Sequence, residues 1–386
     1  MTGPGRLPGG LCQTGNNDFW GPSTLCSKLM DRCGYTRKIF GIGSAVYFWP
    51  QSGAAGGALY LFVVLVDPWG GLPLSLPLHR WPVTGNARFT MPMLARDGRF
   101  DSVMLGTSTG RLMQPAVLDG PLNAHFLNMS MNNAQPHEQY RLLREFLRHH
   151  PDPKVMMVDI DRSWCLYGPK QVPLNPEPWP DWMYRGTPWM GYLQLANLYA
   201  LQEAVNQFML QIGLRHDHYG ADGYTSFVGA DSTYTLARAD RLFVHWGPDH
   251  MRPPSGGVAA APIMQAYLPL VLHAVPDTTL RIVWFPPVQA IRHNPQGSMY
   301  DSMFAACHRY VASLAGHMPN TLVIDFDIPG PIVDNRDMFW DPIHYRLMTA
   351  DRIMGDIIAA VHDRTRPSPD YVVIPPPDPV RSAPVH

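Results

Sequence analysis

Three side chains of the types used in acyl-transfer chemistry occur in two short motifs that lie far apart in the chain. Ser108 lies between Gly106 and Gly110, whereas Asp341 and His344 are separated by only two residues. A serine hydroxyl becomes a strong nucleophile when an imidazole takes its proton, and a carboxylate beside the imidazole fixes its tautomer. The motifs therefore predict a catalytic triad, with Ser108 as nucleophile, His344 as general base and Asp341 as its orienting carboxylate.

Each motif also has an ordinary structural explanation. Ser108 has the residue type that favours a helix N-cap, and the Asp341–His344 spacing alone suits a helix cap beside a surface histidine. Their positions in the chain favour the chemical interpretation. Ser108 follows the first predicted strand and Asp341 follows the last, and open α/β sheets bind ligands at the carboxyl ends of their strands. Folding is therefore expected to bring the two motifs to one edge of a sheet.

Short apolar runs alternate with amphipathic helical segments over the body of the chain. This alternation predicts an α/β fold: a three-layer α/β/α sandwich with a mostly parallel five-stranded sheet. The predicted strands span residues 100–105, 125–129, 155–160, 281–285 and 321–326. The predicted helices span residues 114–118, 136–147, 193–212, 299–314 and 345–361.

The predicted main domain spans residues 67–363 and carries two long irregular insertions, at 166–190 and 213–261. Insertions of that length commonly act as lids or line a binding cleft. The flanking segments 1–38 and 364–386 are rich in Gly or Pro, and they are predicted to be a disordered N-terminal extension and a disordered tail.

Residues 39–66 form the main apolar segment and contain no charged side chain. A helix that spans a bilayer needs about 20 such residues, so the segment predicts a single transmembrane anchor, interrupted at Pro50. Basic residues precede the segment, and the next one is Arg80. This asymmetry predicts an N-terminus in the cytoplasm and a domain on the extracytoplasmic side of the cytoplasmic membrane. The alternative is a buried strand or helix over 58–66.

The composition argues against several other classes. A formal net charge of -1 over 386 residues gives no basic field that would attract a nucleic acid. The five cysteines are odd in number and include no Cys-x-x-Cys pair, so neither a disulfide framework nor a structural zinc site is expected. Cys165 and Cys307 are predicted to be free thiols. The sequence has no phosphate-binding or dinucleotide-binding loop, and no cofactor is predicted.

Beyond the two motifs, the chain resembles the SGNH (GDSL-like) hydrolases, in particular their membrane-anchored relatives that act on cell-envelope polymers. The blocks that carry the resemblance are residues 66–69, 100–108, 126–134, 285–287 and 340–345. The resemblance implies a serine esterase or O-acyltransferase that acts on an ester of a cell-envelope carbohydrate through an acyl-enzyme on Ser108. The expected substrate is an acylated carbohydrate or a small ester.

Two positions depart from the family pattern at the expected oxyanion hole. The second block normally carries a glycine whose backbone N–H stabilises the oxyanion, and Asn133 stands there. Asn tolerates left-handed backbone conformations, so the N–H groups of Ser108 and Asn133 are the oxyanion candidates. The third block normally supplies an asparagine, but Asp161 and Arg162 follow the strand instead. An ionised Asp161 would repel the oxyanion unless it points away or is neutralised by Arg162, and both residues are substrate-cleft candidates.

Two alternatives use different chemistry. The Gly-x-Ser-x-Gly string also occurs in the α/β-hydrolase fold, but that fold places several strands before the serine and separates the acid from the histidine. A zinc site is the other alternative, since His-x-His can bind zinc. Its candidate ligands are His216, His218, Asp222, His245, Asp249 and His250.

A further alternative is a non-catalytic, SGNH-like carbohydrate-binding or assembly protein. Trp179, Trp182 and Trp189 lie in the first insertion and suit stacking on sugar rings, which also makes Trp182 a substrate-cleft candidate. A close Ser108–His344 pair would favour the enzyme, whereas a Ser108 buried as a helix cap would favour the binding protein.

Overall fold

The structure is a computed structural model that describes residues 53–82, 84–166, 179–186, 188–215, 219–243 and 259–375. All of these residues belong to one compact unit, Tyr47–His386. The predicted extension at 1–38 lies outside the described residues. The same is true of the first part of the predicted anchor and of residues 376–386 of the predicted tail.

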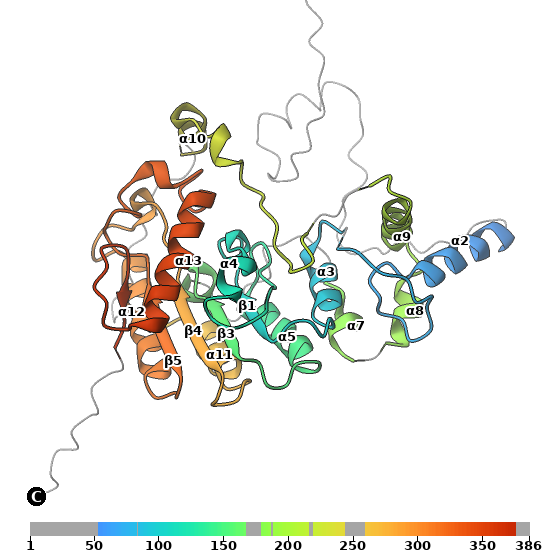
Figure 1. Ribbon diagram of the computed structural model, residues 1–386, viewed down its shortest axis with the longest axis horizontal. Helices are drawn as coiled ribbons and strands as arrows, with labels where there is room; N and C mark the ends of the chain where they lie inside the picture. The colour runs from blue at the N-terminus through green and yellow to red at the C-terminus, as the bar shows by residue number, and fades with distance from the viewer. Residues whose placement is uncertain are drawn as a thin grey trace, which may run out of the picture. The chain divides into compact units, whose positions relative to one another are not determined.

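A six-stranded, mostly parallel sheet forms the centre of the fold (Figure 1). The strands are β1 Ser102–Leu105, β2 Phe126–Asn128, β3 Val155–Asp159, β4 Leu280–Phe285, β5 Thr321–Asp325 and β6 Val372–Val373. Their order is β2-β1-β3-β4-β5-β6, and β6 alone runs antiparallel to its neighbour. The predicted α/β class and mostly parallel sheet are therefore confirmed.

The predicted count of five strands is wrong, because β6 lies in the segment from 364 that was expected to be a disordered tail. Val372 and Val373 pair with β5, and the N–H of Ile374 donates to the carbonyl oxygen of Val323 at 2.9 Å. A strand of two residues has almost no sequence pattern of its own. It forms because pairing satisfies backbone groups along the edge of β5.

Helices connect the strands. They are α2 Gly53–Val66, α3 Ala87–Leu94, α4 Pro115–Asp119, α5 Pro136–Leu147, α6 Arg162–Leu166, α7 Asp181–Tyr184, α8 Met190–Gln194, α9 Leu198–Gln211, α10 Leu236–Phe243, α11 Pro262–Leu272, α12 Met299–Ala315 and α13 Leu347–His362. The single helix predicted over 193–212 is two helices, α8 and α9. Asn197 separates them, because its side-chain oxygen accepts the N–H of Ala200 at 2.9 Å and caps α9.

Apolar cores lie on both faces of the sheet. Successive side chains of a strand point to opposite faces, and in β1 Val103 and Leu105 join one hydrophobic cluster while Met104 joins the other. Helices α5, α11 and α12 contribute to the first cluster, and α4 and α13 contribute to the second. Because both faces are covered, every residue of β1 is buried, and this explains why its sequence does not alternate between apolar and polar residues.

Helix α2 is the described part of the predicted membrane anchor. Its 14 residues give a length of about 21 Å, whereas a bilayer core is about 30 Å thick. Within the described part of the chain, no helix is long and apolar enough to cross a membrane. This finding overturns the anchor predicted over 39–66 and, with it, the predicted location across the cytoplasmic membrane. Instead, α2 packs on the protein: Val63 and Val66 are buried, and the Phe62 ring lies 6.1 Å from the Phe208 ring.

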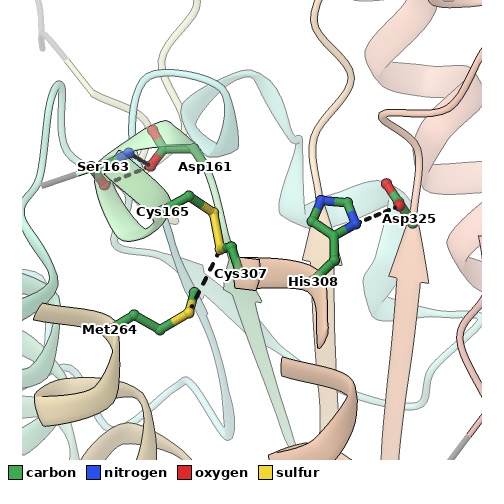
Figure 2. The surroundings of a disulfide bond; sticks show 7 residues. All are labelled: Asp161, Ser163, Cys165, Met264, Cys307, His308 and Asp325. Atoms are coloured by element: carbon green, nitrogen blue, oxygen red, sulfur yellow. Dashed lines mark hydrogen bonds and ion pairs between the residues drawn. A yellow bond between two sulfur atoms is a disulfide. The ribbon is translucent and has the colours of Figure 1, made fainter. Parts of the chain in front are cut away.

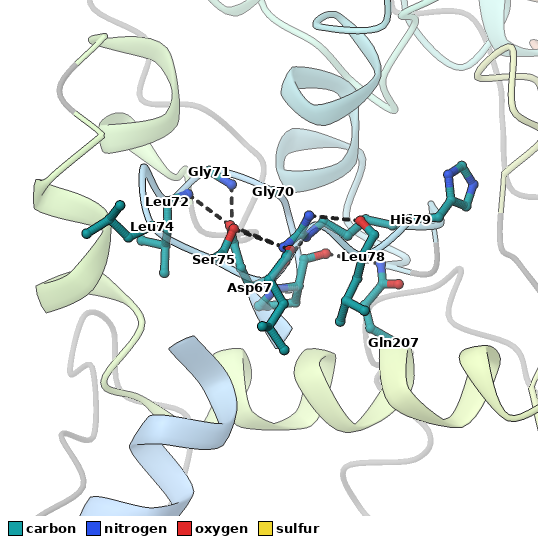
Figure 3. A network of polar contacts seen from close by, with 12 residues as sticks. Asp67, Gly70, Gly71, Leu72, Leu74, Ser75, Leu78, His79 and Gln207 are labelled. Atoms are coloured by element: carbon teal, nitrogen blue, oxygen red, sulfur yellow. Dashed lines mark hydrogen bonds and ion pairs between the residues drawn. The ribbon is translucent and has the colours of Figure 1, made fainter. Parts of the chain in front are cut away.

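Asp67 follows α2 and organises the loop beyond it (Figure 3). Its backbone has a φ of 45°, and its buried carboxylate accepts the N–H groups of Gly71 at 3.1 Å and Leu72 at 2.9 Å. Nε of Arg80 donates to the carbonyl oxygen of Asp67 at 2.8 Å. The block at 66–69 is therefore a buried helix end held by polar contacts.

Cys165 and Cys307 form a disulfide bond, so the prediction of free thiols is wrong (Figure 2). The bond joins α6 to α12, and both cysteines are fully buried. They are 142 residues apart in the chain, yet their Cα atoms are 5.4 Å apart. The count and local spacing of cysteines carry no information on a pair this distant, which is why sequence reasoning missed it.

Removal of this bond should destabilise the fold, because a crosslink restricts the unfolded chain. We expect Cys165→Ala/Cys307→Ala to lower the free energy of unfolding by about 2–4 kcal/mol in urea denaturation. Each single variant should lose a similar amount, since either one breaks the bond. Proteolytic digestion without reductant should give one crosslinked peptide that contains both cysteines. Its absence from the wild-type digest would contradict the bond.

Asp356 on α13 should make the stability of the fold depend on pH. Burial, reinforced by the charge of Asp370, raises the pKa of Asp356 to about 6. The folded state therefore keeps a proton that the unfolded state has lost, and the free energy of unfolding falls as pH rises from about 4 to 6. Asp356→Asn should be more stable than the wild type at pH 7, with a gap that closes towards pH 4. Urea denaturation at both pH values measures this gap, with the exposed Asp152→Asn as control. An equal gap at both pH values would contradict the assignment.

Candidate active site

The two predicted motifs meet at the carboxyl end of the sheet. Ser108 lies in the turn after β1, and its Oγ is 2.8 Å from Nε2 of His344. Nδ1 of His344 is 2.7 Å from Oδ2 of Asp341. The three predicted triad residues thus form a continuous chain of hydrogen bonds, although 236 residues separate the serine from the histidine. Ser108 is half-buried and lies beside His344, so it is not a buried helix cap far from the histidine.

Asp341 holds both the imidazole and its loop. Its Oδ1 accepts the N–H groups of Ile343 at 2.8 Å and His344 at 2.9 Å, while Oδ2 takes the imidazole. Burial acts to raise the pKa of Asp341, but the charge of His344 and these hydrogen bonds outweigh burial and hold the pKa below its ordinary value. The carboxylate is therefore ionised at neutral pH and can stabilise an imidazolium.

A residue of the second insertion touches the same imidazole. The Phe227 ring contacts the His344 ring edge-on, with centroids 5.1 Å apart and planes at 88°. The guanidinium of Arg111 lies 5.1 Å from the Phe227 ring centroid. The insertion at 213–261 therefore contacts His344 through Phe227, but its described residues do not line the cavity that contains Ser108 and His344.

The turn that carries Ser108 is held from below by Asp159, the last residue of β3. Its buried Oδ2 accepts the N–H of Gly110 at 3.0 Å, the N–H of Thr107 at 3.4 Å and the hydroxyl of Thr109 at 2.7 Å. A Cβ at Gly106 would lie 2.8 Å from this carboxyl. The first glycine of the motif is therefore required by the close approach of a neighbouring strand's side chain.

Burial also shifts the pKa of Asp159. Removal from water raises the pKa of its carboxyl well above the ordinary value, and the nearby charge of Asp161 raises it further. The hydrogen bonds from the Ser108 turn act in the opposite direction but are outweighed. Through Oδ2, Asp159 acts as an acceptor for the turn.

The oxyanion candidate Asn133 has a φ of 49°, in the left-handed region that its residue type tolerates. It lines the same cavity as Ser108 and His344. The fold therefore accepts asparagine at the position where the resemblance implies glycine.

Asp161 accepts hydrogen bonds from nearby hydroxyl groups, and Figure 2 shows the one from Ser163. Its Oδ2 accepts the Thr107 hydroxyl at 2.5 Å, and its Oδ1 accepts the N–H of Ser163 at 2.8 Å and the hydroxyl of the same serine at 2.5 Å. Burial raises the pKa of Asp161, while these bonds and the charge of Arg162 lower it by less. The hydrogen bonds to Asp161 and its raised pKa both reduce its repulsion of an oxyanion.

A cavity of about 420 Å³ opens over the triad, a volume within the range typical of small-molecule sites. Ser108, Asn133, Asp161, Arg162 and His344 all line it. Sequence reasoning missed several other lining residues, which are Arg292, Tyr300, Phe304, His308 and Asp327.

Two further histidine–carboxylate pairs lie around this cavity. Nδ1 of His308 is 3.0 Å from Oδ2 of Asp325 (Figure 2), and Nε2 of His293 is 3.0 Å from Oδ1 of Asp327. The hydrogen bond to Asp327 raises the pKa of His293. Asp325 ends β5 and Asp327 follows it, so the strand-end rule that located Ser108 would also have found both carboxylates.

Trp182 does not line the cavity, which corrects its prediction as a cleft residue. It lies in the hydrophobic core, where Cβ atoms at Gly71 and Gly191 would come within 3 Å of its ring. A large apolar ring gains more from such burial than from exposure. Trp179 stacks on Tyr184, with ring centroids 4.3 Å apart.

Most ligands of the alternative zinc site lie outside the described residues. Asp222 is described, and its Oδ1 accepts the N–H of Tyr224 at 3.0 Å. Among the residues that the structure describes, no three His, Cys, Asp or Glu side chains are grouped to hold a metal ion.

The chain matches no protein-family model, and no curated protein is significantly similar to it. The functional assignment therefore depends on the site itself.

Loss of the Asp159 carboxyl should destabilise the turn that carries Ser108. We expect Asp159→Ala to lower the free energy of unfolding by about 3 kcal/mol or more, because it leaves buried N–H groups without an acceptor. Asp159→Asn keeps a neutral acceptor oxygen and should lose much less. Urea denaturation at pH 7 compares the two variants. Equal losses would contradict the role of this side-chain oxygen as the acceptor for the turn.

Proposed function

We propose that this protein is a serine ester hydrolase or acyltransferase that works through an acyl-enzyme on Ser108. The observation that carries the proposal is the hydrogen-bonded series Ser108–His344–Asp341, with separations of 2.8 Å and 2.7 Å. Such distances suit direct proton transfer between a nucleophile and its base. The closeness of Ser108 and His344 favours an enzyme over a carbohydrate-binding protein.

In the first step, Oγ of Ser108 attacks the ester carbonyl carbon as Nε2 of His344 takes the hydroxyl proton. The carbonyl π electrons move to oxygen, and the imidazolium is stabilised by ionised Asp341. The tetrahedral intermediate then expels the alcohol, which receives the proton from His344. An acyl group remains on Ser108.

In the second step, water or an acceptor hydroxyl attacks the acyl carbonyl and gives its proton to His344. Collapse of this intermediate releases an acid or a new ester and returns the proton to Ser108. Backbone N–H groups of Ser108 and Asn133 are the proposed donors to the oxyanion in both steps. Water as the attacking group gives a hydrolase, and a sugar hydroxyl gives an acyltransferase.

We further propose that the fold is the three-layer sandwich of the SGNH hydrolases. The strand order β2-β1-β3-β4-β5 supports this assignment. Strand β2 lies on one side of β1, and β3 to β5 follow one another on the other side, so the strand order reverses between β1 and β3. Ser108 follows β1 at that point, where doubly wound sheets bind ligands. The resemblance of the sequence blocks supports an acylated carbohydrate or a small ester as substrate.

Activity on 4-nitrophenyl acetate tests the proposal. Ser108→Ala and His344→Ala should each lower kcat/KM by about a thousandfold or more, and Asp341→Asn should lower it strongly because the imidazole loses its orienting anion. Ser313→Ala and His317→Ala, which change exposed residues of the same types, are the matched controls. A fluorophosphonate probe should label Ser108 in the wild type and not in His344→Ala.

Equal rates in the wild type and all three triad variants would remove the serine mechanism. Labelling of another residue by the probe would relocate the nucleophile.

A further inference from the structure

Two arginines line the cavity over the triad. Arg162 begins α6 directly after β3, and Arg292 belongs to the short 3-10 helix Ala290–Arg292 after β4. Both are half-buried, and both come from the carboxyl ends of neighbouring strands. Sequence reasoning selected Arg162 but not Arg292, because the loop after β4 has no motif.

The position of Arg162 is defined by its neighbours. Its guanidinium lies 4.7 Å from the centroid of the Phe304 ring on α12, and its Nη1 donates to the carbonyl oxygen of Arg292 at 3.4 Å. Stacking on an aromatic ring and a backbone hydrogen bond restrict a long side chain, which lowers the entropy lost when it binds a ligand. The same hydrogen bond ties the two arginine-bearing segments together.

The carboxylates of the cavity are engaged within the protein. Asp161 accepts hydrogen bonds from Thr107 and Ser163. Asp327 accepts the N–H of Val288 at 3.1 Å and pairs with His293. Among the described residues, the cavity therefore combines Ser108 with two arginines, and Asp161, which feels the charge of Arg162, and Asp327 both accept hydrogen bonds from other protein groups.

We infer that Arg162 and Arg292 form a specificity subsite for an anionic group of the substrate, a carboxylate or a phosphate. Guanidinium groups present paired N–H donors that match these oxyanions, and partial burial strengthens the attraction relative to water. The inference rests on the proposed function, because it names the class of ester that Ser108 attacks: an ester whose acyl or alcohol part carries a negative charge.

Matched esters that differ in one charge test the subsite. 4-Acetoxybenzoate carries its carboxylate on the alcohol part of the ester, and its methyl ester is the neutral control. The mono-4-nitrophenyl ester of terephthalic acid carries its carboxylate on the acyl part, and its methyl ester is again the neutral control. We expect the wild type to prefer the charged member of at least one pair in kcat/KM. Arg162→Gln and Arg292→Gln should each reduce that preference at least about tenfold.

Arg309→Gln is the matched control, since it removes the same charge from an exposed position on α12 and should leave the preference unchanged. Arg292→Lys keeps the charge without the planar fork and should retain part of the preference. A general disturbance of the triad lowers kcat/KM for both esters of a pair together. Comparison within each pair therefore separates recognition of charge from such a disturbance. Thermal unfolding checks that each variant is folded. A preference that stays within about threefold of the wild type in both glutamine variants would overturn the subsite.

Binding separates this inference from the proposed function. In Ser108→Ala, ligand-observed NMR should detect benzoate or phenyl phosphate binding more tightly than neutral benzamide, and the added substitution Arg292→Gln should abolish the difference. Comparison of the two anions decides between carboxylate and phosphate. Binding of anions without turnover of any ester would overturn the serine mechanism and keep the subsite. Turnover without any charge preference, in kinetics and in binding, would keep the mechanism and overturn the subsite.

Discussion

The carboxyl of Asp159 is the constraint on which the rest of the site depends. It lies at the end of β3 and accepts three hydrogen bonds from the turn that follows the adjacent strand β1. Because β1 and β3 are paired in parallel register, this one side chain sets the height and direction of the turn above the sheet. Ser108 is thereby presented towards His344 by the sheet itself.

Two helices that line the same cavity are joined by a covalent bond. Helix α6, which begins with Arg162, and helix α12, which carries Phe304 and His308, are connected by the buried Cys165–Cys307 bond. The sulfur of Met264 on α11 lies 3.6 Å from Cys307, so the bond is packed into the apolar core (Figure 2). A covalent link between the two helices limits how far the arginine and its aromatic neighbour can separate. The Ser108 turn is thus held by hydrogen bonds from the sheet, and helices α6 and α12 are held together by a crosslink.

Three histidine–carboxylate pairs surround one cavity, but they differ in what the histidine faces. His344 contacts the Ser108 hydroxyl, while the His308 ring stacks on Phe285 with centroids 3.9 Å apart, and His293 is beside Arg292 in the chain. All three carboxylates come from the C-terminal third of the chain, at the end of β5 or after it. The arrangement makes this edge of the sheet rich in groups that exchange protons and bind oxyanions, in agreement with acyl transfer to or from a polar substrate.

Local pattern in the sequence was enough to predict the α/β class, the strands β1 to β5 and the meeting of Ser108 with the Asp341–His344 motif. Buried parallel strands appear as short apolar runs, and open sheets bind ligands at the carboxyl ends of their strands, so the motifs of Ser108 and of Asp341–His344 could be placed at one edge of the sheet from their residue types together with their positions. Three features depended on tertiary structure: the Cys165–Cys307 bond, the strand β6 and the burial of α2 on α9. Each of them pairs segments far apart in the chain, and the free energy of such a pairing belongs to neither segment alone. The same reason explains why Arg292 was found only in the folded chain, since a side chain's role depends on what packs beside it.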